Sequence, residues 1–368
     1  MKAITLIPGT TNLRLVDLPE PSVTAPDEIK LKVLQVGICG TDREEASGGR
    51  AEAPPGKTEL IIGHEMLGQV VAIGSAVSAV QPGDYAVFSV RRGCGHCPAC
   101  AINRSDMCCT GDYTERGIKG RDGYQAEYVV DSEQYVVKIP GDLASMGVLT
   151  EPMSVVEKAI DEAIRIQGSR WPDAVDPQSW LRGKQALVAG IGPIGLLAAF
   201  ALLLRGADVT GLGRQDMDTP RPSMLTRIGA KYVDERRIKP DALEEHFGQI
   251  DLIFEATGAA RLEFDLLAVL GMNGLYVLTG IPGGDRPINI EGAALMRQLV
   301  LRNQVMVGSV NASRKHFLTA VEDLQNAQKN WGNAIDRIVT HRFPYTQFEE
   351  ALALHSTDEI KTVLEWNV

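Results

Sequence analysis

The sequence has no excess of basic residues, since 37 lysines and arginines face 47 aspartates and glutamates and the formal net charge is −10. Sequence-independent binding of nucleic acid depends on a basic surface, so this balance argues against it. The N-terminal segment MKAITLIPGTTNLRLVDLPEP has no apolar run of secretory length and carries an early proline and glycine. We therefore expect no signal peptide. Internal repeats and low-complexity segments are also missing.

One uncharged stretch, residues 186–204, is long enough to cross a bilayer. Three glycines and Pro193 interrupt its first half, so it is better explained as a buried strand, a tight turn and a buried helix. We therefore expect no membrane span. Six cysteines in a chain of 368 residues without a secretory signal suggest reduced thiols and a cytoplasmic protein.

The length of the chain predicts two domains. The first, residues 1–155, contains short apolar runs between glycine and proline turns, which is typical of a β-rich, barrel-like unit. Its expected strands are 28–36, 68–73, 85–88 and 124–130. The tail, residues 311–368, has a predicted helix at 315–326 and is expected to return to this first domain.

Strands and helices alternate in the second predicted domain, residues 156–310. The expected strands are 185–189, 208–212, 231–233, 251–255, 274–279 and 305–310. Helices are expected at 153–166 and 193–205, and an irregular connector at 168–182. Apolar strands alternating with helices indicate an α/β fold with a doubly wound parallel sheet covered on both faces.

Four cysteines, Cys94, Cys97, Cys100 and Cys108, fall within fifteen residues at the spacing C-x2-C-x2-C-x7-C. Four thiolates can close a zinc tetrahedron, and the glycines and proline between them allow the tight turns that this requires. The alternatives are a disulfide pair, which a reducing compartment disfavours, and four unrelated thiols. Because Cys109 follows Cys108 directly, the spacing leaves the fourth ligand open. A closed site of this kind stabilises a lobe and does no chemistry.

A second metal site is predicted from Cys39, in GICGTD, and His64, in GHE. A thiolate, an imidazole and one carboxylate can hold zinc while leaving a position open for an alcohol. Glu65 and Glu151 are the available carboxylates. Taken alone, His64 is more simply a hydrogen-bonded histidine and Cys39 a small buried hydrophobic residue, so only the joint pattern favours a metal.

A glycine-rich turn follows the predicted strand 185–189 and opens the predicted helix 193–205. It comprises Gly190, Ile191, Gly192, Pro193, Ile194 and Gly195. These glycines permit a tight turn and close approach of a dinucleotide pyrophosphate, whose charge the helix N-terminus attracts. After the next strand comes Gly213-Arg214-Gln215, where sites that prefer NAD usually place an acidic residue. The Arg214 guanidinium suits a 2′-phosphate, so we expect NADP to be favoured. Asp216 and Asp218 follow closely and leave NAD as an alternative cofactor.

Five motifs, taken in order along the chain, resemble those of the zinc-containing medium-chain alcohol dehydrogenase superfamily. They are GICGTD, GHE with GQVVAIG, the four-cysteine lobe, Glu151-Pro152 before a helix, and GxGxxG. Three further segments resemble its glucose 1-dehydrogenase branch. They are Tyr113 to Ile118, Gly213 to Gln215 and Gly308 to Asn311. The resemblance implies a GroES-like catalytic domain formed by residues 1–155 and 311–368, a Rossmann domain formed by residues 156–310, and two zinc ions per chain.

The resemblance also implies roles for individual residues. Cys39 and His64 would bind the catalytic zinc with Glu65 and Glu151 as exchanging carboxylate ligands, and Cys108 rather than Cys109 would complete the lobe. Thr41 would carry the proton toward solvent. Sugar hydroxyls would be held by Thr41, Glu115, Glu151 and Asn311. Further cofactor contacts are expected from Leu278, Thr279, Gly280, Ser309, Val310 and Asn311.

The expected reaction is oxidation of the C1 hydroxyl of D-glucose, or of another aldose, to the lactone with hydride transfer to the nicotinamide. A zinc-dependent polyol, threonine or other sugar dehydrogenase is the close alternative. A zinc-free quinone reductase would lack the metal ligands, and a non-catalytic cofactor sensor or a crystallin-like structural protein would have no need to keep them. We also expect a homo-oligomer, a dimer or tetramer, with residues 295–306 as a candidate pairing edge.

Overall fold

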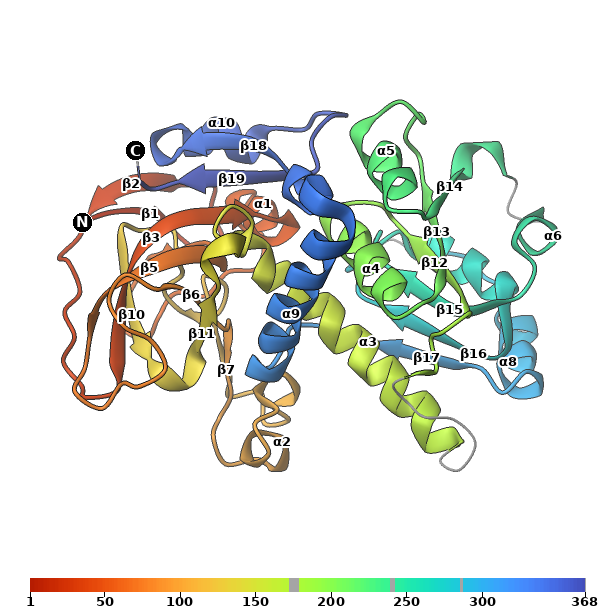
Figure 1. Ribbon diagram of the computed structural model, residues 1–368, viewed down its shortest axis with the longest axis horizontal. Coiled ribbons are helices and arrows are strands. Elements are labelled where there is room, and N and C mark those ends of the chain that lie inside the picture. The colour runs from red at the N-terminus through yellow and green to blue at the C-terminus, as the bar shows by residue number, and fades with distance from the viewer. Residues whose placement is uncertain (172–178, 239–241, 285–286, 368) are drawn as a thin grey trace. The chain divides into compact units, whose positions relative to one another are not determined.

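The computed structural model describes residues 1–368 apart from 172–178, 239–241, 285–286 and 368. Contacts divide the chain into two compact units (Figure 1). Unit 1 comprises Met1–Ser154, Asn311–Gln325 and Ile335–Val368, and unit 2 comprises Val155–Val310 and Asn326–Ala334. The domain boundaries expected from the sequence place residues 326–334 in the first domain. They lie in unit 2 because helix α9 (Arg314–Trp331) ends there, where Trp331 packs edge-on against Phe200 with ring centroids 5.4 Å apart.

Unit 1 is built around β3 (Glu28–Ile38), the longest strand in the described part of the chain. The main sheet has the order β11-β6-β5-β3-β19-β18, and β10 also pairs with β3. Side chains from Glu28 to Val33 alternate between half-buried and buried, as expected for a strand with one face on a core. Its partners are β5 (Glu65–Ile73), β6 (Tyr85–Phe88), β10 (Tyr128–Ser132), β11 (Val136–Ile139), β18 (Val339–Pro344) and β19 (Lys361–Glu365).

Two small sheets and four helices complete unit 1. One sheet has the order β2-β1-β4 and the other β7-β8-β9. Their strands are β1 (Lys2–Leu6), β2 (Leu13–Asp17), β4 (Leu60–Ile61), β7 (Arg91–Arg92), β8 (Thr114–Arg116) and β9 (Gly120–Arg121). The helices are α1 (Gly40–Ala46), α2 (Pro98–Ala101), α10 (Phe348–Ala353) and the first turns of α9.

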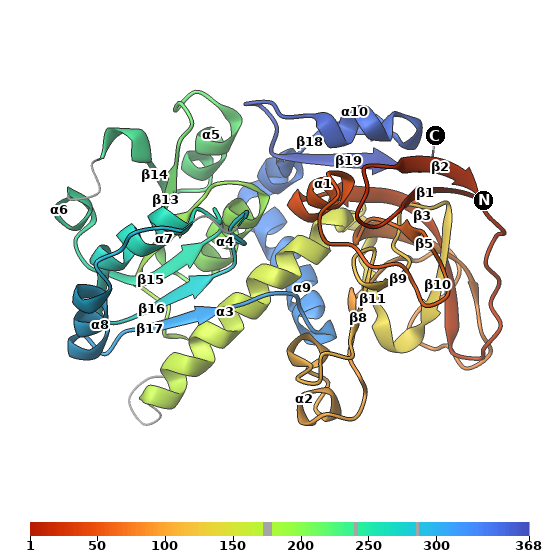
Figure 2. The same cartoon turned by 180° about the vertical axis from the view of Figure 1, so that it is seen from behind.

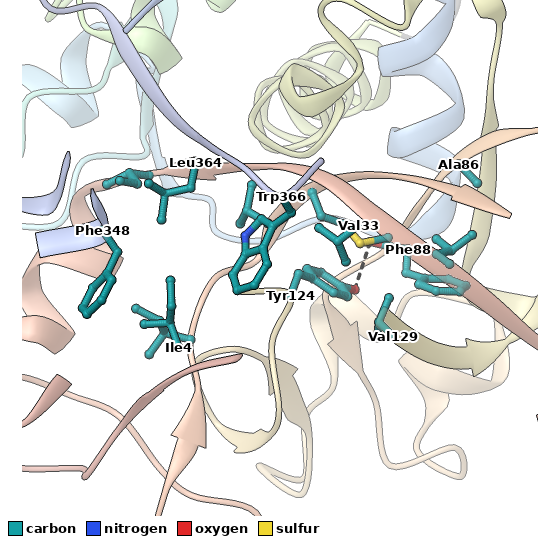
Figure 3. Close-up of a cluster of buried hydrophobic side chains, with 14 of the residues drawn as sticks. Ile4, Val33, Ala86, Phe88, Tyr124, Val129, Phe348, Leu364 and Trp366 are labelled. Carbon is teal, nitrogen blue, oxygen red and sulfur yellow. Dashed lines mark hydrogen bonds between the residues drawn. The ribbon is translucent and has the colours of Figure 1, made fainter. Parts of the chain in front are cut away.

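The core of unit 1 joins residues from both ends of the chain, with Ile4, Phe88 and Trp366 in one buried cluster (Figure 3). Tyr124 is fully buried there, and its hydroxyl donates to the Phe88 carbonyl at 3.3 Å. The predicted strand at 124–130 therefore starts too early. The Tyr124 amide bonds the Gly63 carbonyl instead of a sheet partner, and pairing with β3 begins only at Tyr128.

Unit 2 contains a six-stranded parallel sheet of order β14-β13-β12-β15-β16-β17, so the predicted doubly wound sheet is confirmed. In such a sheet the strand order reverses between β12 and β15, and ligands bind beyond the carboxyl ends of the strands at that point. The strands are β12 (Gln185–Ala189), β13 (Asp208–Gly213), β14 (Lys231–Asp234), β15 (Ile250–Glu255), β16 (Leu270–Leu278) and β17 (Val305–Gly308). Helix α4 (Pro193–Leu204) lies against β12 and β13, as Figure 1 shows.

The remaining helices of unit 2 are seen around the sheet in Figure 2. They are α3 (Thr150–Arg170), α5 (Pro220–Arg227), α6 (Leu243–Phe247), α7 (Ala260–Asp265) and α8 (Gly292–Leu301). Helix α3 begins earlier and ends later than expected. Its last turn is held in place because the Arg170 and Gln167 side chains bond the Asn273 carbonyl. Part of the predicted connector, residues 172–178, lies outside the described residues.

The predicted pairing edge, residues 295–306, combines the second half of helix α8, up to Leu301, with the start of the strand that follows it. The edge strand is β17, which ends at Gly308 rather than at residue 310. Within the described ranges, no helix is long and apolar enough to span a membrane. The uncharged stretch 186–204 is, as predicted, a strand, a turn and a helix.

Candidate metal centres and cofactor site

Cys39 and His64 meet in unit 1, where the Cys39 sulfur lies 3.1 Å from His64 Nε2. Cys39 directly follows β3 and caps α1, where its sulfur accepts a hydrogen bond from the Thr41 amide at 3.2 Å. His64 stands directly before β5, the antiparallel neighbour of β3. The register pairs Gly37 with Glu65, so adjacent strand ends bring the two side chains together although 25 residues separate them.

Glu65 belongs to the same group, because ligand atoms of Cys39, His64 and Glu65 all lie within 4.8 Å of one another. The Glu65 carboxylate also forms a buried ion pair with Lys361, at the start of β19. Glu151, in the first turn of α3, is not a member of this group among the described residues. Its charge nevertheless acts on His64, and burial raises the pKa of the Glu151 carboxyl to about 7.

Asp42 is a site residue that sequence reasoning missed. Its Oδ2 accepts the Cys39 amide at 2.8 Å, and its Oδ1 lies 3.6 Å from His64 Nδ1. A carboxylate behind a metal-binding histidine commonly fixes which ring nitrogen carries the proton. The signal was present in the sequence, since an acidic residue three positions after a helix cap completes a capping box.

The donor set at Cys39 and His64 fits a zinc ion. Burial raises the pKa of the Cys39 thiol, and a buried thiolate needs a compensating cation. His64 Nδ1 faces Asp42 Oδ1 at 3.6 Å, so Nε2, the ring nitrogen 3.1 Å from the Cys39 sulfur, is the one that faces the metal position. A soft thiolate, an imidazole and a nearby carboxylate are together the ligand types that catalytic zinc uses.

Four cysteines form a second, closed group in unit 1. The sulfur atoms of Cys94, Cys97, Cys100 and Cys108 all lie within 4.8 Å of one another, whereas Cys109 is exposed and outside the group. With zinc–sulfur bonds of about 2.3 Å, tetrahedral geometry places sulfur atoms about 3.8 Å apart. The Cys94 and Cys100 sulfurs are 3.9 Å apart, so the arrangement fits zinc. The Cys100 amide points at the Cys97 sulfur and lowers the pKa of that thiol to about 7.

Glu115 and Asn311 also meet in unit 1, although nearly two hundred residues separate them. The Asn311 amide donates to Glu115 Oε1. Glu115 lies in β8 and is 9% exposed. Two residues later Gly117, at φ +73°, packs on the backbone of Gly63, where an added Cβ would lie 2.7 Å from the Gly63 carbonyl carbon. This close approach places the strand that carries Glu115 beside the segment that carries His64.

Thr41, the remaining predicted residue of this centre, lies in the first turn of α1 and is half-buried. Its amide bonds Cys39, while its hydroxyl makes no hydrogen bond to any described residue. The structure thus places Thr41 beside the Cys39 sulfur with its hydroxyl available.

The glycine turn of unit 2 has the geometry that a dinucleotide requires. Gly190 has φ +90°, and a Cβ there would lie 2.7 Å from the Thr257 side chain. Gly195 leaves no space for a side chain against the Gly190 carbonyl. Gly192 is the N-cap of α4 and offers no side chain to occupy the free amides of the first turn. Ile191 and Pro193 complete a helix N-terminus that is open to an anion.

Arg214 follows β13, and its exposed guanidinium makes no hydrogen bond or ion pair within the described chain. Gln215 is held on the backbone by Tyr232, whose hydroxyl donates to the Gln215 carbonyl at 2.6 Å. Asp216 pairs with Arg236 at 2.5 Å. Asp216, one of the two acidic residues that leave NAD as an alternative, is therefore held in an exposed ion pair, while the guanidinium of Arg214 remains available for a phosphate.

Glu255 organises the other predicted cofactor segment and was also missed. This fully buried carboxylate at the end of β15 accepts the Gly258 amide at 3.0 Å and the Gly280 amide at 3.2 Å. Its carbonyl accepts both the Thr279 amide and the Thr279 hydroxyl. Glu255 thereby fixes the loop after β16. A charged residue closing an apolar strand was the available signal.

The other predicted cofactor residues lie at neighbouring strand ends. Leu278 ends β16, and its carbonyl accepts the Ser309 amide at 2.9 Å. The buried Ser309 hydroxyl has no partner among the described residues. Val310 is 51% exposed. Asn311 adopts a left-handed φ of +66° and belongs to unit 1, where it contacts Glu115.

Comparisons with known proteins agree with this geometry. Residues 25–141 match the alcohol dehydrogenase GroES-like domain, and residues 144–366 match the glucose dehydrogenase C-terminus. The chain is 39% identical over 366 residues to glucose 1-dehydrogenase 2 of Vulcanisaeta moutnovskia, covering 99% of both chains. It is 40% identical over 372 residues to glucose 1-dehydrogenase 1 of Caldivirga maquilingensis, covering 100% of this chain and 99% of that one.

Among solved structures, Haloferax mediterranei glucose dehydrogenase in complex with NADP, Zn and gluconolactone superimposes with a TM-score of 0.87. That chain is 32% identical in sequence, and each chain is covered completely. The family matches span most of the sequence and agree with the arrangement of the thiolates, the imidazole and the glycine turn. The chain belongs to the zinc-dependent medium-chain alcohol dehydrogenase superfamily, in its glucose dehydrogenase branch.

Proposed function

We propose that this protein oxidises the C1 hydroxyl of D-glucose to the lactone and transfers the hydride to NADP, with NAD as a second cofactor. The observation that carries the proposal is the 3.1 Å approach of Cys39 and His64 beside a strand that presents Glu115. Relatives named glucose 1-dehydrogenase over the full length of the chain support the sugar assignment.

Cys39, His64 and Glu65 would hold the catalytic zinc, with Glu151 as an exchanging carboxylate, and Cys94, Cys97, Cys100 and Cys108 would hold the structural one. When bound, zinc polarises the sugar hydroxyl and lowers its pKa, and the nicotinamide accepts the hydride. The Thr41 hydroxyl can take up the released proton and pass it toward solvent.

Sugar hydroxyls need fixed acceptors, which Glu115 and Asn311 supply from one rigid contact. Glu151, whose pKa burial raises to about 7, can accept or donate at its carboxyl oxygens near neutral pH. Holding the sugar in one orientation in this way lowers the reaction barrier by several kcal/mol.

NADP preference follows from Arg214, since a charge-assisted bond to a 2′-phosphate is stronger than a neutral one. The turn from Gly190 to Gly195 would bind the pyrophosphate. Leu278, Thr279, Gly280, Ser309 and Val310 would flank the nicotinamide half of the cofactor.

A homo-oligomer is part of the proposal. On its outer side, β17 has no strand partner in the described chain. Nearby α8 exposes Val300 at 75% and Leu301 at 69%. An unpaired edge beside exposed apolar side chains favours pairing with a second copy of the chain. We place the protein in the cytoplasm because its metal thiols require reducing conditions.

The test is a steady-state screen of the zinc-loaded protein with NADP and NAD. Glucose would be compared with other aldoses, sorbitol and L-threonine, before and after chelation. We expect the highest kcat/KM with glucose and NADP, loss on chelation and recovery with zinc. Preference for a polyol or for threonine would favour the alternative dehydrogenase. Binding of NADP without turnover of any alcohol or sugar would favour a cofactor sensor.

A further inference from the structure

The Glu115 carboxylate is held by one of its two oxygens only. Arg91 Nε and Nη2 donate to Oε1 at 3.0 and 2.8 Å, and the Asn311 amide donates to the same atom. The other oxygen, Oε2, makes no hydrogen bond to any described residue, and it is not among the buried unpartnered atoms. One oxygen is therefore saturated by three donors, and the other remains available to accept a sugar hydroxyl.

Arg91 is buried and makes the contacts that would fix the orientation of the Glu115 carboxylate. It lies in β7, directly opposite Glu115 in β8, and is 7% exposed. Its guanidinium stacks on Tyr113 at 4.0 Å from the ring centroid. A buried carboxylate is tolerated only with a paired counter-charge, and the planar fork of arginine restricts the pair to one geometry.

The third nitrogen of Arg91 reaches the four-cysteine lobe. Nη1 donates to the Asp106 carbonyl at 2.7 Å. Asp106 lies in the short 3-10 helix Ser105–Met107, between Cys100 and Cys108. The Asp106 carboxylate accepts hydrogen bonds from Arg104, with Nε 3.0 Å from Oδ1 and Nη2 2.8 Å from Oδ2. Because this segment runs between two of the sulfur ligands, its position depends on the lobe being closed.

We propose that Arg91 is a positioning residue for the sugar site and that it couples the closed four-cysteine lobe to Glu115. A folded lobe presents the Asp106 carbonyl, that carbonyl and Tyr113 hold the Arg91 guanidinium, and the guanidinium turns Glu115 Oε2 toward the ligand. The lobe then determines affinity for the sugar in addition to stabilising unit 1. This inference rests on the proposed function, because it assigns the Glu115 oxygen to a sugar.

The first test compares Arg91→Lys with wild type. Lysine keeps the charge but cannot bond Glu115 and Asp106 together, so we expect KM for glucose to rise about tenfold. The kcat and the KM for NADP should stay within about threefold, since neither the metal ligands nor unit 2 is altered. Lys57→Ala is the matched control, because it removes an exposed ion pair with Asp122 in the same unit. Its kinetic constants should equal those of wild type.

The second test opens the lobe directly with Cys97→Ser, using D-gluconolactone as the titrated probe. We expect zinc content to fall by one ion per chain and calorimetric affinity for the lactone to weaken about tenfold. Affinity for NADP should be unchanged, which would show that unit 2 remains folded. Arg104→Gln, which loosens Asp106 without touching a sulfur ligand, should weaken lactone binding with zinc retained.

Unchanged glucose KM in Arg91→Lys, or unchanged lactone affinity in both lobe variants, would overturn the coupling. Equal losses of NADP and lactone affinity would also overturn it, because they would reveal general unfolding. Failure of the proposed function looks different. In that case wild type itself would neither oxidise glucose nor bind the lactone.

Discussion

Lys361 and Glu65 form an ion pair in the interior of unit 1, with side chains 2% and 3% exposed. Lys361 begins β19 and Glu65 begins β5, and both strands flank β3. Between them lies Gly37, where an added Cβ would sit 2.9 Å from the Lys361 side chain. The pair balances a buried negative charge directly beside His64.

In the metal-free protein, Lys361→Met is expected to lower the free energy of unfolding by about 3–5 kcal/mol, because it leaves the Glu65 charge buried without a partner. Urea unfolding measures this, with zinc content recorded in parallel. Lys361→Met combined with Glu65→Gln should recover more than half of the loss, since no charge is then left unpaired. A single variant as stable as wild type would show that Glu65 does not need Lys361.

The carboxyl group of Asp131 is expected to make the free energy of unfolding depend on pH in the acidic range. Burial raises the pKa of this carboxyl, but the charges of Arg116 and Arg92 outweigh burial and lower it to about 2. Arg116 bonds Asp131 at 2.6 and 3.0 Å, and Arg92 at 2.6 Å. Because the pKa is lower in the folded state, the stabilisation is complete above the unfolded value of 3.8 and is lost as pH falls toward about 2.

Asp131→Asn should therefore be less stable than wild type near neutral pH by about 2 kcal/mol, because the pKa of the carboxyl falls from 3.8 in the unfolded chain to about 2 in the folded one. The difference should stay constant down to about pH 4 and shrink below it. Denaturant titrations at a series of pH values measure it. A difference that grows on acidification would contradict the assigned direction of the pKa shift.

Regular elements were predictable where apolar runs were bounded by turns. The strands 185–189 and 85–88 match β12 and β6 to the residue. The predicted bounds of a strand or helix are wrong where a contact with a residue distant in sequence determines where the element begins or ends. Tyr124 is drawn out of strand pairing by Gly63, and α3 continues past Gly168 because Arg170 is anchored on the β16 segment. Local sequence carries no record of such partners.

The site was predictable to a similar degree. The spacing of the four lobe cysteines predicts their zinc site, and the glycines beside Cys39 and His64 helped to identify these two residues as metal ligands. Arg91, Lys361 and Glu255 escaped, because a charged residue inside a strand looks ordinary until its partner is known. Resemblance to relatives indicated Glu115 and Asn311, whereas their mutual hydrogen bond is a property of the folded chain.

Cys108 and Cys109 give a direct test of lobe assignment. The structure puts Cys108 with the three other sulfurs and leaves Cys109 exposed. Cys108→Ser should therefore lose about one zinc per chain, and Cys109→Ser should lose none, because a tetrahedral site needs all four thiolates. Zinc analysis after dialysis distinguishes them. Equal retention in both variants would mean that the neighbouring thiols exchange.

Arg214 governs the choice between cofactors. Arg214→Ala should raise KM for NADP about 10–100-fold, the range expected for one charge-assisted bond of about 1.5–3 kcal/mol. KM for NAD should change little, since NAD has no 2′-phosphate. Arg227→Ala is the matched control, because it removes an exposed arginine at the end of α5 in the same unit. Initial rates with both cofactors at saturating glucose measure the ratio of KM for NADP to KM for NAD.

If Arg214→Ala and Arg227→Ala raised KM for NADP equally, the effect would be general electrostatic attraction, and Arg214 would have no specific role.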